Sequence, residues 1–68
     1  MNRLRAMRFA RGLNQRELSE KAHTPQSLVS AIERGVLKPW PAVIGRLAKA
    51  LECPQSELFP DEDYAGRP

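Results

Sequence analysis

Apolar residues recur every three or four positions along most of this chain, which is the period of a helix that buries one face. No segment shows the alternation of a half-buried strand, so the pattern predicts an all-α protein with five helices. The recurring apolar positions are Leu4 with Met7, Leu18 with Ala22, Val29 with Ile32, and a longer stripe of Ile44, Leu47, Ala48 and Leu51.

The first two predicted helices have clear boundaries. The first covers about residues 2–11 and ends at Gly12, a residue type that often terminates helices. Asn14 is the predicted N-cap of the second helix. Glu17, three residues later, would complete a capping box, in which each side chain binds the backbone N–H of the other residue.

The third predicted helix has both a start and a stop signal. Thr24 is its predicted N-cap and Pro25 its first residue, where the missing N–H of proline costs nothing. Gly35 is predicted to end the helix, because glycine readily adopts the left-handed conformation found there. The second and third helices are therefore joined by a tight turn around His23.

Two prolines divide the rest of the chain. Pro41 follows a loop at residues 36–41 and can open a fourth helix, and Pro54 can open a short fifth helix. Residues 1–59 are therefore predicted to form one domain, and residues 60–68 a short acidic tail that frays.

Composition narrows the class of protein. A chain of 68 residues that is 41% hydrophobic suits one small globular domain. Cys53 is the single cysteine and His23 the single histidine, which excludes an internal disulfide and leaves too few ligands for a zinc site. No apolar run is long enough to span a membrane and no signal peptide is recognisable. We therefore expect a cytoplasmic protein without a metal or a cofactor.

Charge is unevenly distributed along the chain. Residues 1–49 hold ten Lys or Arg against three Glu, a net charge of +7, whereas residues 50–68 hold one Arg against five acids, a net charge of −4. A basic body attracts the phosphates of nucleic acid, because binding releases condensed counterions. A solvated charged surface without a partner is the alternative that charge alone leaves open.

The second and third helices have the layout of a helix-turn-helix, in which the second helix of the motif lies in the major groove of DNA. Over residues 4–59 the sequence resembles the lambda-repressor-like helix-turn-helix family, of the Cro and Xre type. The matching blocks are RGLNQRELSEKA, SLVSAIERG, LAKAL and SELF, in the family's order and without a long insertion. The resemblance implies a five-helix DNA-binding domain and a sequence-specific transcriptional regulator, most simply a repressor.

The resemblance also implies roles for individual residues. Gln15 would bind a DNA phosphate and brace the third helix. Arg8 and Glu33 would form an ion pair between the first and third helices, with Arg8 also facing phosphate. Gln26 suits base reading because an amide can bind adenine N6 and N7 together. The predicted DNA-contacting residues, for which plain solvent exposure is the alternative, are Arg8, Gln15, Arg16, Gln26, Ser27, Ser30, Ala31, Arg34 and Lys38.

Four positions depart from the family pattern. His23 stands where the turn usually has glycine, so we expect a positive φ and some strain there. Leu28 replaces a small polar residue and either packs against the second helix or presses on the DNA backbone. Trp40 and Pro54 stand where capping Ser or Thr is common, so we expect irregular starts for the fourth and fifth helices.

A symmetric dimer on a two-fold DNA site is expected, because one helix-turn-helix contacts only a few base pairs. The predicted interface residues are Trp40, Val43, Gln55 and Leu58, with Phe59 mainly in the core. The alternative is that Leu58 closes the core of a monomer and Trp40 covers it. Double-stranded DNA and a second copy are thus the expected partners, with no small-molecule effector.

Two other classes of function compete with DNA binding. A protein-interaction module, or an antitoxin-like partner that retains the fold, is favoured by the weakly polar third helix with Leu28 and Ala31. The basic body, together with Gln15 and Gln26, opposes that class. An enzyme is disfavoured, because the chain has one His, one Cys and no clustered carboxylates outside the tail.

Overall fold

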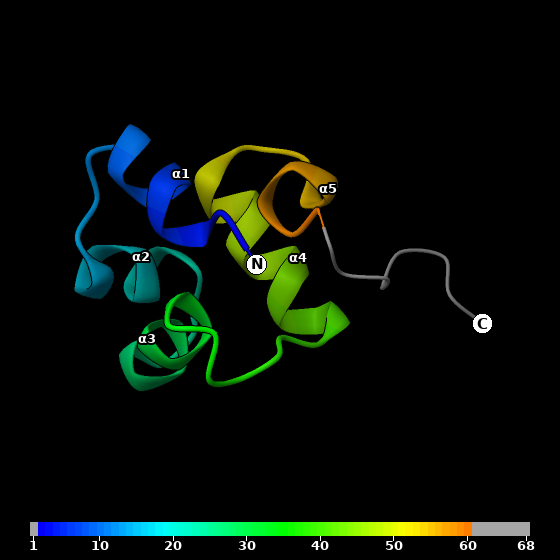
Figure 1. Cartoon of the computed structure of the whole chain (residues 1–68). Coiled ribbons are helices and arrows are strands. Elements are labelled where there is room, and N and C mark those ends of the chain that lie inside the picture. The colour runs from blue at the N-terminus through cyan, green and yellow to red at the C-terminus, as the bar shows by residue number, and fades with distance from the viewer. Residues whose placement is uncertain (1, 61–68) are drawn as a thin grey trace.

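The computed structural model describes residues 2–60, which form five helices and no strands (Figure 1). The predicted all-α fold is confirmed. Over the same residues, no helix is long and apolar enough to cross a membrane. Apart from Pro60, the predicted acidic tail lies outside the described residues. The helices are α1 (Leu4–Ala10), α2 (Gln15–Lys21), α3 (Gln26–Glu33), α4 (Pro41–Leu51) and α5 (Gln55–Leu58).

The predicted apolar stripes meet in one core. α2 packs against both α3 and α4, α5 packs against α4, and α1 contacts α3 (Figure 1). Each large side chain that is fully buried contributes about 1.5–3 kcal/mol, so a core of this kind supplies most of the stability of so short a chain. The largest fully buried side chains are Leu4, Leu18, Val29, Ile32, Val43, Ile44, Leu47, Leu51, Leu58 and Phe59.

The start of α2 is as predicted. The Asn14 side-chain oxygen accepts from the backbone N of Glu17 at 2.7 Å, and the Glu17 carboxylate accepts from the backbone N of Asn14 at 2.8 Å. This reciprocal capping box satisfies two backbone donors that the first turn of a helix leaves unpaired.

The start of α3 differs from the prediction. The helix begins at Gln26, and Pro25 precedes it with a ψ of 142° instead of occupying the first helical position. The Thr24 hydroxyl donates to the backbone carbonyl of Ala22 at 3.0 Å, so it stabilises the turn and does not cap the helix. Proline disfavours helical geometry in the residue before it, which keeps Thr24 in the turn.

Positive φ angles mark the helix ends. Gly12 and Gly35 have φ values of 70° and 74°, which confirms both predicted stops. His23 has a φ of 52°, as its place in the turn predicted. Glu52 also lies in the left-handed region, with a φ of 56°, and ends α4 as its C-cap, which was not predicted.

Side-chain hydrogen bonds connect the ends of different helices. Arg11 Nε donates to the backbone carbonyl of Leu51 at 2.7 Å, so a cation lies at the negative, C-terminal end of α4. The Asn2 side chain accepts from the backbone N of Leu4 at 3.1 Å and donates to the backbone carbonyl of Ile32 at 2.8 Å. The chain before α1 is thereby fixed to the C-terminal part of α3.

The last two helices begin without side-chain caps, as predicted. Pro41 is the first residue of α4, and Trp40 precedes it in an extended conformation. Pro54 precedes α5 in an extended conformation, so the helix itself begins one residue later than predicted.

Candidate nucleic-acid interface

The two sides of α3 differ in chemistry. Val29 and Ile32 are fully buried in the core. Leu28 is half-buried and packs against that core. Gln26 and Ser27 are exposed at the N-terminal end of α3, where a recognition helix contacts bases. The remaining predicted base-facing residues, Ser30 and Ala31, are half-buried.

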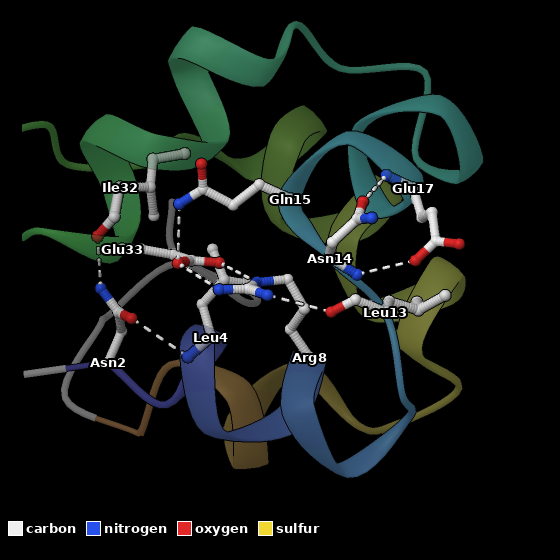
Figure 2. Close-up of polar contacts among 9 residues, drawn as sticks. All are labelled: Asn2, Leu4, Arg8, Leu13, Asn14, Gln15, Glu17, Ile32 and Glu33. Atoms are coloured by element: carbon white, nitrogen blue, oxygen red, sulfur yellow. Dashed lines mark hydrogen bonds and ion pairs between the residues drawn. The ribbon is translucent and has the colours of Figure 1, made fainter.

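A buried ion pair fixes α3 to α1 (Figure 2). Arg8 Nε donates to Glu33 Oε2 at 2.6 Å and Arg8 Nη2 donates to Glu33 Oε1 at 3.1 Å, a two-point contact that fixes both position and orientation. The predicted pair is confirmed. The two side chains are only 7% and 3% exposed, so the pair is buried.

The environment keeps both members of the pair charged. Burial, the largest single influence, raises the pKa of Glu33 by desolvation. The hydrogen bonds from Arg8 and Gln15, together with the positive charges of Arg8 and Arg5, outweigh it and lower the pKa below its ordinary value. The hydrogen bond to Glu33 is the main cause that raises the pKa of Arg8.

Gln15 connects this pair to the first turn of α2. Its side-chain Nε2 donates to Glu33 Oε1 at 3.1 Å (Figure 2). The carboxylate can only accept, so the amide must present its NH₂ group to Glu33. One N–H of that group is used, and the second is left for another acceptor. Gln15 therefore braces α3 as the family resemblance implied, and its contact with phosphate stays a prediction.

Arg8 is occupied within the protein. Besides the two contacts with Glu33, its Nη1 donates to the backbone carbonyl of Leu13 at 2.9 Å, and its guanidinium lies 4.6 Å from the centroid of the Phe9 ring. These contacts and its burial assign Arg8 a positioning role between α1, α3 and the chain before α2. Direct contact of Arg8 with phosphate stays a prediction.

The other predicted phosphate contacts are accessible. Arg16, Arg34 and Lys38 are exposed. Arg16 Nε lies 3.4 Å from a carboxylate oxygen of Glu20, one turn along α2, in a pair whose side chains are 77% and 67% exposed. An exposed pair of this kind is worth about 0–1 kcal/mol, so a phosphate can compete for Arg16.

The predicted dimer residues divide into two kinds. Val43 and Leu58 are 1% and 0% exposed within the single chain, so their assignment to an interface is wrong. Both complete the core between α4 and α5, because a short chain needs every large apolar side chain on these helices inside. Phe59 is buried, as predicted. Trp40 is 46% exposed, and Gln55 is half-buried.

Two structural contacts had no recognisable signal in the sequence. The Leu13 carbonyl, which accepts from Arg8, is a backbone group that any residue could supply. The contact of Arg11 with the C-terminal end of α4 joins residues 40 positions apart, and no local pattern marks it. Apart from these contacts, Val36 is 70% exposed, so the loop that carries Trp40 has a second accessible apolar residue.

The sequence is similar to a known family of domains and to a known protein. A family model described as a helix-turn-helix domain matches residues 2–58. A protein of Acinetobacter baylyi named competence pilus inhibition repressor is 40% identical over 58 residues, which is 81% of this chain and 53% of that protein. The chain thus spans about half the length of the curated relative it matches.

Proposed function

Because this chain belongs to the helix-turn-helix domain family, of the Cro and Xre type, we propose that it is a DNA-binding transcriptional repressor that inserts α3 into the major groove of a two-fold operator. One observation carries the proposal. The buried network of Arg8, Glu33 and Gln15 fixes α3 relative to α1 and α2, while the N-terminal end of α3 stays polar and exposed. Because α3 is fixed on its inner side and exposed at its N-terminal end, it can contact bases in the major groove of DNA.

Base reading rests on the exposed end of α3. Gln26 can bind adenine N6 and N7 together, and the methyl of Ala31 can contact the methyl of thymine. Ser27 and Ser30 can donate or accept, so they discriminate less between bases. Specificity is therefore expected to depend most strongly on Gln26.

Phosphate contacts hold the helix in register but carry no sequence information. The unused N–H of Gln15 can donate to one phosphate from the first turn of α2, where the helix dipole also favours an anion. Arg16, Arg34 and Lys38 are exposed on neighbouring segments and can neutralise further phosphates. Gln15 would thus link the DNA backbone directly to the Glu33 carboxylate.

A two-fold operator requires a dimer, and exposed apolar side chains support one. Trp40 and Val36 leave apolar surface in solvent on the segment between α3 and α4. Aromatic residues are enriched at the centres of protein interfaces, where they bury much area at little entropic cost. A contact through this segment would leave the exposed end of α3 for DNA.

Selection of duplexes from a random pool, followed by binding measurements on selected and random duplexes over a salt series, tests the function. We expect a selected sequence with two similar half-sites about 34 Å apart, and binding that weakens steeply with salt. The selected duplex should bind about 10³-fold or more tightly than the random one. No enrichment, together with affinity independent of salt, would favour a protein-interaction module instead.

A further inference from the structure

A basic pocket lies between the C-terminal end of α2 and the second half of α4. Its volume is 330 Å³. No residue that lines it is among the predicted DNA-contacting residues. The lining residues are Lys21, Ala22, His23, Arg46, Lys49 and Ala50.

The chemistry of the pocket suits an anion with an apolar portion. Ala22 and Ala50 are buried and form a small apolar surface, around which the cations Lys21, Arg46 and Lys49 are exposed. No carboxylate of residues 2–60 forms an ion pair with any of these three cations. Like charges that converge on one cavity repel each other, and an anionic occupant would relieve that repulsion.

The chain itself contains a segment with the complementary chemistry. Asp61, Glu62 and Asp63 are three consecutive acids, followed by the aromatic Tyr64. Carboxylates can pair with the three cations, and a tyrosine ring can lie against the alanines with a cation over its face. We propose that the pocket is a carboxylate-binding site whose occupant is this chain's own segment 61–64.

The described chain ends at Pro60, two residues after α5, and α5 packs against α4. Gln55 of α5 reaches α4 at Gly45, where its side-chain nitrogen lies 3.6 Å from the position a Cβ would occupy. Lys49 is one helical turn beyond Gly45 and so lies on the same side of α4. Four extended residues span about 13–14 Å, which is comparable to the length of α4. A tethered segment also has a high effective concentration, so a weak site can still be filled.

Amide NMR spectra of the full chain test the proposal. The triple substitution Asp61→Asn, Glu62→Gln and Asp63→Asn removes the three charges and leaves residues 2–60 unchanged. We expect the amide signals of the residues lining the pocket to shift, while those of α3 stay in place. In the reciprocal variant, Arg46→Gln with Lys49→Gln, the amide signals of residues 61–64 should shift.

A matched control is Arg34→Gln, which removes an exposed cation at the end of α3. It should leave the amides of residues 61–64 where they are. The shifts of the triple variant should shrink when ionic strength rises to about 1 M, where the screening length falls to about 3 Å. Shifts that persist on dilution show that segment 61–64 binds the pocket of the same chain. Shifts that disappear on dilution show that it binds the pocket of a second copy. Either result supports segment 61–64 as the occupant of the pocket.

The proposal is overturned if the triple substitution moves no pocket amide, or if Arg34→Gln perturbs residues 61–64 as much as the pocket substitutions do. It is also overturned if duplex DNA shifts the pocket amides and the acidic residues do not, since the site would then belong to the DNA interface. Failure of DNA binding would leave the proposal intact, because the spectra of the substituted chains are compared without DNA.

Discussion

At the scale of single residues, the ion pair of Arg8 and Glu33 is the contact on which we expect the proposed DNA interface to depend most. The pair is buried, held at two points, and joined by Gln15. Loss of one partner would leave an unpaired buried charge, which typically costs about 3–5 kcal/mol. The pair would affect DNA binding without touching DNA, because it fixes the position of α3 relative to α1.

The coupling between Arg8 and Glu33 can be measured in a double-mutant cycle with Arg8→Met and Glu33→Leu. We expect each single variant to lose about 3–5 kcal/mol of unfolding free energy, and the double variant to lose less than the sum. The exposed pair of Arg16 and Glu20 is the matched control, with an expected coupling of about 0.3–0.5 kcal/mol. Equal coupling energies in the two cycles would show that burial does not strengthen the interaction of Arg8 with Glu33.

Glu33 also makes stability depend on pH. Its pKa is lowered in the folded protein, so the unfolded chain binds a proton more readily at acid pH. The stabilisation is therefore complete above the unfolded pKa, about 4.3, and is lost as the pH falls through the lower folded pKa. The difference in urea-unfolding free energy between the native chain and Glu33→Gln should shrink in that window. A difference that stays constant across this window would refute the assignment.

His23 is a second residue-scale test. A left-handed conformation costs a residue with a Cβ about 1–2 kcal/mol, whereas glycine adopts it freely but gains entropy in the unfolded chain. His23→Gly should therefore be neutral to stabilising. Lys21→Gly, inside α2, should cost about 1 kcal/mol and is the control. A clear fall in melting temperature for His23→Gly would reveal contacts of the imidazole that outweigh the strain.

At the scale of elements, α3 is proposed to read bases and the segment after it to contact phosphate. Gln26→Ala should cost about 1–3 kcal/mol on the selected duplex and relax preference at one base pair. Lys38→Ala should weaken all duplexes alike and lower the salt slope by about 1. Lys49→Gln removes the same charge on α4 and should change neither preference nor slope appreciably. If Gln26→Ala weakened random and selected duplexes equally, the base-reading role would be wrong.

The helix ends and the buried faces show which kinds of structural feature can be predicted from a sequence. The capping box of α2 and the stop at Gly35 depend on short-range chemistry, so the sequence predicted both correctly. The Thr24 hydroxyl had two backbone groups within reach, and only the folded turn decided between them. Leu58 was assigned to an interface because apolar periodicity marks buried positions without telling an internal contact from one between two chains.

At the scale of the whole molecule, dimerisation is expected to use the segment between α3 and α4. With Val43 and Leu58 inside the core, Trp40 and Val36 are the large apolar side chains that this side leaves exposed. A dimer squares the discrimination of one recognition helix, because both half-sites must match. Substitutions of Trp40 or Val36 should therefore weaken dimerisation and operator binding together, without unfolding the chain.

Trp40 is the only tryptophan, so its fluorescence reports on this contact directly. Its side chain is 46% exposed in the single chain, and burial against a partner should shift its emission to shorter wavelength as the protein concentration rises. Val36→Glu should abolish that shift and hold sedimentation at the mass of a monomer, because a buried, unpaired carboxylate is costly. The variant should keep its helical circular dichroism and still bind single half-sites weakly. Arg5→Glu, which alters charge on α1, is the control and should leave the dimer intact. A native chain that stays monomeric at micromolar concentration and on a two-fold duplex, with no change in Trp40 emission, would show that it binds its half-sites independently.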